Sequence, residues 1–281
     1  MKRSKNGSSL FIQKSDIEEF FSRSSGNRIF RKALVQAADG KALLKIVGRF
    51  VYFNSVFGGG VANLAGEIAV RQQLFRDKAE EIYAVGDRSV QIASAVFFAA
   101  IDEFGDTSSA SRFTHRALAQ ATLKGMVQYY GCSVGEADEL VRPNVAVEEA
   151  ITRVKQGYLL NQVVDERKIF RGLGFHMGSE IFADEEFNIL NTLLNKKYSE
   201  LVAHLRRERV SVSDSVHPAY AWIHIHTMVE MDHFQFATLG ANRALRYYSG
   251  PLKGAELKDL VIDGFKEFAE VQTFFMEHIA D

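Results

Sequence analysis

Cysteine and proline are scarce in this 281-residue chain, which has one cysteine, Cys132, and three prolines. A single cysteine excludes a disulfide within the chain and a zinc site built from several cysteines, and it fits a reducing compartment. Prolines interrupt helices, so few prolines in a chain that is 47% hydrophobic favour an all-helical fold. No alternation of apolar and polar residues stands out to predict a strand.

An excess of one charge and long apolar runs are also lacking. The 34 basic and 35 acidic residues leave a net charge of −1, so neither a nucleic acid nor an anionic membrane surface is expected as a partner. No apolar run has the length that spans a bilayer. The opening MKRSKNGSS lacks the apolar segment of a signal peptide. We therefore expect a cytoplasmic protein whose residues 1–14 form a flexible tail.

Helical periodicity and capping residues divide the chain into roughly ten helices. A capping box at Ser15 and Glu18 is expected to open the first helix, and Asp87 and Asp184 are expected N-caps of later ones. No linker or repeat separates parts of the chain, so residues 1–281 are expected to form a single helical domain. The helices are expected over residues 16–23, 28–38, 41–57, 61–83, 88–104, 110–130, 134–156, 160–178, 185–208, 217–248 and 255–279.

The stretch 217–248 contains two histidines and a glutamate in the order His226-x-x-x-Glu230-x-x-His233. At about 100° per residue these three side chains lie on one stripe of a helix, and His224 lies away from that stripe. The neighbouring residues are apolar, so we expect the helix to be buried. Burying two imidazoles and a carboxylate is costly unless a metal ion or hydrogen-bond partners compensate them. The triplet alone is equally compatible with a metal site and with a buried polar stripe.

A second glutamate–histidine combination is expected around a tight turn. The helix over 88–104 is apolar until Asp102 and Glu103 at its end, and His115 opens the next helix. Glu103 and His115 are therefore expected to face each other across the turn. The alternatives are a helix-end charge for Glu103 and a capping or surface position for His115.

Two further glutamates lie in apolar surroundings. Glu67 is isolated in VANLAGEIAV, and an ion pair with an arginine is the alternative to a metal-binding role. Glu180 follows an apolar stretch, and His176, four residues earlier, could be a ligand or a partner of a ligand. The neighbouring Glu185 and Glu186 are expected to be exposed.

The candidate ligands together are four carboxylates and three imidazoles, which are Glu67, Glu103, His115, Glu180, His226, Glu230 and His233. Four ligands saturate a zinc ion, so this larger set suits two iron or manganese ions. Helical bundles with inward-facing glutamates and histidines commonly hold paired irons in this way.

The order of these motifs resembles the haem-oxygenase-like diiron oxidases and oxygenases over roughly residues 50–240. The resemblance is carried by Asp102-Glu103-Phe104-Gly105, His115, Glu180 and the closing His-x-x-x-Glu-x-x-His. It implies a haem-oxygenase-like multi-helix bundle whose core helices hold two irons and no haem. By position it implies Glu103, His115, His226 and His233 as ligands. Glu230 stands where the family more often has aspartate, Glu67 is matched by its surroundings and Glu180 by a loose motif.

The function that this resemblance implies is oxidation of a small molecule by O2 at a ferrous pair. The substrate would be an amino acid, a derivative of one or a similar metabolite of specialised biosynthesis. The reaction would be desaturation, hydroxylation, N-oxygenation, cyclisation or oxidative C–C cleavage. An electron donor could be needed, and the chain could form a homodimer. A cofactorless oxidase, a thiaminase-like hydrolase and a non-catalytic helical binding protein stay open as alternatives, although Cys132 is a poor candidate for the hydrolase nucleophile.

Overall fold

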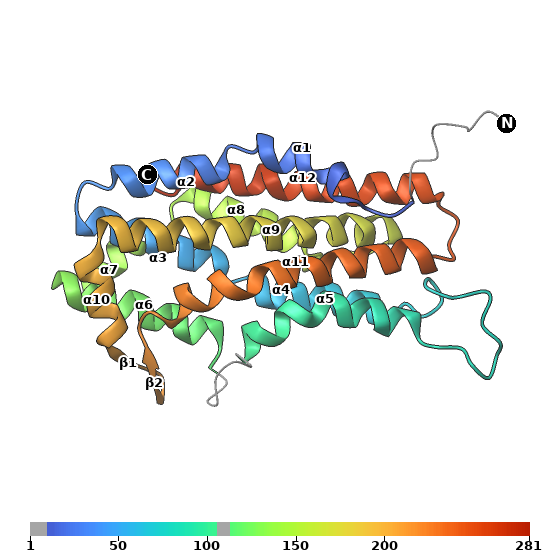
Figure 1. The fold of residues 1–281 in the computed structure, drawn as a ribbon, viewed down its shortest axis with the longest axis horizontal. Coiled ribbons are helices and arrows are strands. Elements are labelled where there is room, and N and C mark those ends of the chain that lie inside the picture. Colours follow the sequence, from blue (N-terminus) through green and yellow to red (C-terminus); the bar gives the residue numbers. More distant parts are fainter. Residues whose placement is uncertain (1–9, 106–112) are drawn as a thin grey trace.

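Helices dominate the computed structural model, which describes residues 10–105 and 113–281 except for the side chains of Ala99, Val229 and Glu230. Within these ranges the chain has twelve helices and one two-stranded sheet, which confirms the all-helical prediction (Figure 1). The helices are α1 (Lys14–Arg23), α2 (Gly26–Gln36), α3 (Gly40–Asn54), α4 (Phe57–Ala69), α5 (Arg88–Phe104), α6 (His115–Tyr130), α7 (Val134–Val141), α8 (Val145–Gly157), α9 (Glu166–Lys197), α10 (Ser199–Arg207), α11 (Ala221–Tyr247) and α12 (Gly254–His278). The strands β1 (Arg209–Val212) and β2 (Ser215–Pro218) form an antiparallel hairpin between α10 and α11.

The long helix α9 runs through the middle of the bundle (Figure 1). It packs along α12 on one side and along α11 on the other, and α11 in turn packs against α5, which pairs with α4. Helices α5, α6, α9 and α11 carry the described candidate ligands other than Glu67, so this arrangement brings four chain segments to one part of the core.

Glycines allow α9 and α12 to approach closely. A Cβ atom at Gly174 of α9 would overlap the carbonyl oxygen of Val261 in α12, and one at Gly264 of α12 would overlap the carbonyl oxygen of Arg171 in α9. The backbones of the two helices are therefore in direct contact at this crossing, which fixes the position of α9 and of the side chains that follow on it.

Several local predictions are confirmed. The side chain of Asp87 accepts a hydrogen bond from the backbone N–H of Val90 and caps α5. Gly131, with a φ of 64°, ends α6 in the left-handed conformation that favours glycine. The helix predicted over 134–156 is present but is divided near Pro143 into α7 and α8. These features depend on short-range chemistry, which is why the sequence predicts them.

The predicted break at Asp184 is wrong, because Asp184 lies inside the 32-residue helix α9. The N-cap of that helix is Asp165, whose side chain accepts from the N–H of Lys168. The segment around Asp184 contains no helix breaker, so the helix continues through it. The capping box of α1 is formed by Gln13 and Asp16, two residues earlier than expected.

The helix predicted over 61–83 is shorter and begins earlier. Helix α4 starts at Phe57, includes the three glycines 58–60 and ends at Ala69. Residues 71–87 form turns and a loop that extends from the end of the bundle (Figure 1). Gly58 and Gly60 are needed inside α4, because a Cβ at Gly58 would lie 2.8 Å from the Cβ of Glu103 and one at Gly60 would lie 2.7 Å from the ring of Tyr158.

The flexible tail predicted over 1–14 needs correction at its end. Ile12 is buried, its N–H donates to the side chain of Asn242 at 2.7 Å, and its carbonyl accepts from the same side chain. Residues 10–13 are thus held against α11, and Lys14 already belongs to α1. Residues 1–9 lie outside the described part of the chain.

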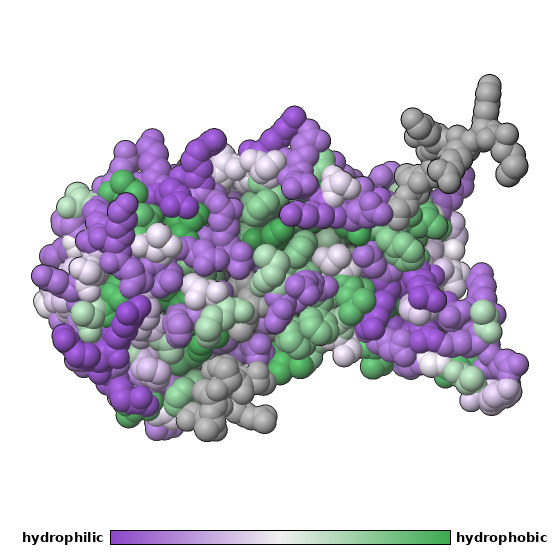
Figure 2. Space-filling view, in the orientation of Figure 1, coloured by the Kyte–Doolittle hydropathy of each residue, from purple (hydrophilic) through white to green (hydrophobic). Residues whose placement is uncertain are grey.

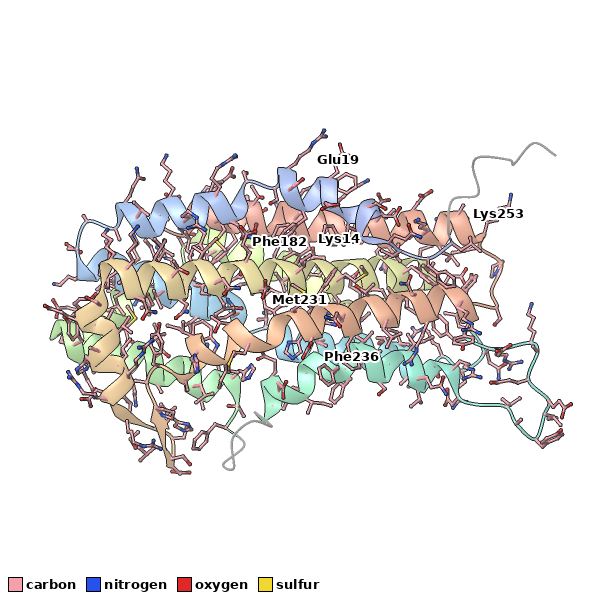
Figure 3. The ribbon with its side chains drawn as sticks, viewed as in Figure 1. Lys14, Glu19, Phe182, Met231, Phe236 and Lys253 are labelled. Carbon is pink, nitrogen blue, oxygen red and sulfur yellow. The ribbon has the colours of Figure 1, made fainter. Side chains whose placement is uncertain are left out.

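Exposed apolar side chains gather on the outer face of α5 and α11, where Figure 2 shows a green band. They are Phe97, Ile101, Phe104, Met228, Met231, Phe236 and Leu239. Figure 3 labels Met231 and Phe236 on α11 and Phe182 on α9, and Met231 and Phe182 line the same outer pocket. The opposite sides of the same helices carry the polar residues described below. In the described ranges, no helix has the length and apolar character required to cross a membrane.

Candidate metal centre

Glu103 and His115 meet where α5 ends and α6 begins, as predicted. Thr114 caps α6 by accepting a hydrogen bond from the N–H of Ala117, which places His115 at the first helical position. The Nδ1 atom of His115 lies 3.1 Å from Oε1 of Glu103. The Nε2 atom of His115 is buried and has no hydrogen-bond partner among the described residues. A metal ion bound at this nitrogen would satisfy it; among the described residues His176, His204 and His217 also have one buried ring nitrogen with no hydrogen-bond partner.

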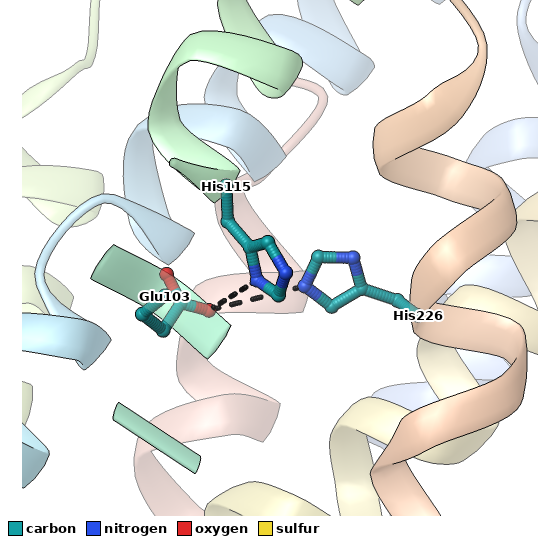
Figure 4. A group of neighbouring side chains, drawn as sticks. All are labelled: Glu103, His115 and His226. Atoms are coloured by element: carbon teal, nitrogen blue, oxygen red, sulfur yellow. Dashed lines mark hydrogen bonds and ion pairs between the residues drawn. The ribbon is translucent and has the colours of Figure 1, made fainter. Parts of the chain in front are cut away.

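His226 reaches the same place from α11 (Figure 4). Its Nδ1 lies 2.7 Å from the carbonyl oxygen of Trp222, which can only accept, so Nδ1 carries the hydrogen. Its Nε2 then carries the lone pair and lies 3.9 Å from Oε1 of Glu103. The ring also stacks on Phe187, with ring centres 4.1 Å apart. Metal-binding histidines are typically oriented by such a bond from the other ring nitrogen to a backbone carbonyl.

The spacing of these three groups fits one metal ion. Glu103, His115 and His226 each offer one ligand atom, and these atoms all lie within 4.8 Å of one another. Two ligands on one ion, each about 2.1 Å from it, are separated by roughly 3–4 Å. In neutral His226 the Nε2 is an acceptor, like Oε1 of Glu103, and a cation could bind between them; in protonated His226 the Nε2–H instead donates toward Glu103.

A second glutamate–histidine group lies on α9 and α11. Glu180 places Oε1 at 3.1 Å from Nδ1 of His176 and Oε2 at 3.6 Å from Nδ1 of His233. The Nε2 of His233 lies 3.2 Å from Oδ2 of Asp102, a contact that the sequence did not predict. His176 is also 3.3 Å from the hydroxyl of Tyr158. Histidine 176 is therefore a hydrogen-bond partner of Glu180, one of the two roles that its spacing allowed.

Both glutamates are held in the ionised form. Burial by itself would raise the pKa of Glu103, but hydrogen bonds and attraction from His115 and His226 outweigh it and lower the pKa to about 2. Burial also opposes ionisation of Glu180, and His176 and His233 overcome it and bring the pKa of Glu180 well below its ordinary value. The two carboxylates are consequently available as anionic ligands at neutral pH.

The two groups face a common space. Glu103, Glu180, His226 and His233 line one cavity of about 40 Å³, whose other walls are largely apolar. Glu103 and His226 also border a second cavity of about 30 Å³, together with His115. Glu103 thus lies between the two groups, where a carboxylate can serve two neighbouring ions. Cys132 lines neither cavity.

Glu67 is not brought to this centre. Its side chain is 31% exposed and pairs with Arg71, whose Nη1 lies 2.5 Å from Oε2 of Glu67. Glu67 is nine residues beyond Gly58, the residue of α4 that contacts Glu103, which is about 14 Å along the helix. It lines neither cavity, and the arginine ion pair, the alternative that its surroundings allowed, is what the structure contains.

Glu230 and Glu186 lie on the two helices that border the centre, α11 and α9. The backbone of Glu230 belongs to α11, one turn after His226, but its side chain lies outside the described part of the structure. Glu186 was expected to be exposed and is instead 3% exposed, and it lines the larger of the two ligand cavities. The expectation failed because Glu186 lies about 120° around α9 from Glu180, and its burial comes from long-range packing such as its contact with Gln272 of α12. His224 is exposed, as its position on the helix predicted.

No protein-family model matches this chain, and no curated protein or solved structure does so either. The chemical meaning of the centre therefore has to come from its own donor atoms, their spacing and their surroundings.

Proposed function

We propose that this protein is a non-haem diiron oxidase or oxygenase of the haem-oxygenase-like type, which uses O2 to oxidise a small molecule. The observation that carries the proposal is that Glu103 and His226, which cluster with His115, line one cavity of the helical core together with Glu180 and His233. An amino acid or an amino-acid derivative is the proposed substrate, on the strength of the family resemblance.

The donor set favours iron or manganese. Carboxylate oxygens and imidazole nitrogens are suited to both ions, and no thiolate is present in either group. Five described donors exceed the four that saturate a zinc ion. A bound ferrous pair would supply the electrons for the reduction of O2, which the side chains of this site do not provide.

The chain's own residues would hold, orient and shield such a pair. With a metal ion bound, Nε2–H of His233 would donate to Asp102, and the lone pair of Nδ1 would face the ion beside Glu180. The carbonyl of Trp222 does the same for His226. Aromatic rings in the cavity wall, Phe57, Phe187 and Phe268, exclude bulk water from the reacting groups.

Anaerobic loading with ferrous iron followed by rapid mixing with O2 tests this function. We expect two irons per chain, a transient visible absorption and O2 consumption well above that of the metal-free protein. Zinc-loaded protein is the control, because zinc has no redox chemistry and should give neither signal. Binding of less than one iron per chain together with no absorption change would contradict the proposal. Acceleration of the transient by amino acids, compared with fatty acids, would then identify the substrate class.

A further inference from the structure

Glu186 is a buried carboxylate in the cavity that the candidate ligands share. It comes from α9, six residues after Glu180, and precedes Phe187, whose ring stacks on His226. Only 3% of its surface is exposed, and the cavity it lines has Glu103, Glu180, His226 and His233 as its other titratable walls. The motifs that point to the metal centre do not include it.

A short chain of hydrogen bonds fixes the orientation of Glu186. The Nε2 of Gln272, a fully buried residue of α12, donates to Oε1 of Glu186 at 2.8 Å and to Oδ1 of Asn27 at 2.6 Å. Asn27 in turn donates from Nδ2 to Oε2 of Glu185 at 2.8 Å. Gly26 makes room for this arrangement, since a Cβ there would overlap the Gln272 amide. Nε2 of Gln272 is the donor in both of its hydrogen bonds. Glu186 therefore accepts a hydrogen bond from Gln272, which fixes the position of its carboxylate.

The charge of the cavity favours a cation. Glu103, Glu180 and Glu186 are three carboxyl groups on a space of about 40 Å³, and none of the described residues that line it is a lysine or an arginine. Like charges in a buried site disfavour one another's ionisation, whereas divalent ions bound between them remove that penalty. The burial of Glu186, its place in the cavity wall and the charge of the cavity therefore support a ligand role.

We propose that Glu186 is an additional carboxylate ligand of the metal pair, and that Gln272 is the residue that positions it. This inference rests on the proposed function, since it requires that metal ions occupy the cavity. The sequence motifs do not include Glu186. A hydrogen-bond chain from Asn27 of α2 through Gln272 of α12 holds it in place on α9.

The test compares wild type with Glu186→Gln by Mn²⁺ titration calorimetry and by thermal unfolding with and without Mn²⁺. Glutamine keeps the acceptor for Gln272 and removes the charge. We expect the weaker of two Mn²⁺ ions to bind at least about tenfold more weakly in the variant. The melting temperature of the metal-free variant should equal or exceed that of wild type, because one of three like charges is gone. The stabilisation by Mn²⁺ should shrink.

Asp184→Asn is the matched control, because Asp184 lies on the same helix but lines an outer pocket instead of this cavity. It should bind Mn²⁺ as wild type does. A Glu186→Gln variant with wild-type affinity for both ions would overturn the inference and leave the proposed function standing. Wild-type protein that binds no Mn²⁺ would overturn both. If Glu186→Gln does not fold, Glu186→Asp is the deciding variant. Its carboxylate is one methylene further from the cavity, so the second ion should bind more weakly. Unchanged binding would refute the ligand role.

Discussion

His226→Ala is expected to abolish binding of the metal ion held by Glu103 and His115. The variant removes one of three clustered ligand atoms. The two that remain, on Glu103 and His115, are too few to bind an ion tightly. Loss of a residue that merely supports a ligand costs roughly 10–100-fold in metal affinity, so loss of the ligand itself should cost at least about 100-fold. Metal content after dialysis against Mn²⁺ or Fe²⁺, together with titration calorimetry, measures the change.

His224→Ala is the matched control for this variant. His224 is on the same helix two residues earlier, is exposed and lies away from the cavity, so its loss should leave metal binding unchanged. Alanine favours the helix, and the far-ultraviolet circular dichroism of both variants should match wild type. Equal metal content in the two variants would show that His226 does not bind the ion.

Gly174→Ala is expected to cause the largest loss of stability of any single methyl addition along α9. The added Cβ would overlap the backbone carbonyl of Val261, and neither helix can relieve that overlap by a change of rotamer. The helices would have to move apart, which should lower the free energy of unfolding by about 3 kcal/mol. Because Glu180 lies six residues further along α9, metal affinity should fall as well. Thermal unfolding of the metal-free protein is the measurement.

Gly66→Ala controls for the intrinsic effect of replacing glycine in a helix. No atom lies within 4 Å of a Cβ at Gly66, which is an exposed position of α4. Alanine should therefore leave stability unchanged or raise it by about 0.5–1 kcal/mol. If Gly174→Ala melted at the wild-type temperature, the close backbone contact between α9 and α12 would not contribute to stability as described.

Local sequence chemistry predicts much of this molecule. The spacing of His226 and His233 places both on one helix stripe whatever surrounds it, and both are found in the same cavity. The end of an apolar helix at Glu103 and a new helix start at His115 likewise predict that the two meet. These inferences need only the helical repeat and capping rules.

Long-range packing accounts for what the sequence did not reveal. The contact of Asp102 with His233 joins residues 131 positions apart, and the approach of α9 to α12 depends on glycines whose purpose becomes visible only in the folded chain. Glu67 shows a different reason. Arg71 stands four residues later, at helical ion-pair spacing, so a local partner competed with the metal-binding interpretation.

The central claim, that these glutamates and histidines hold two adjacent metal ions, is tested most directly by anomalous diffraction from crystals grown with Mn²⁺. We expect two neighbouring peaks, one bound by Glu103, His115 and His226, and the other in contact with Glu180 and His233. A cavity without an anomalous peak, or a peak only beside Glu67, would contradict it.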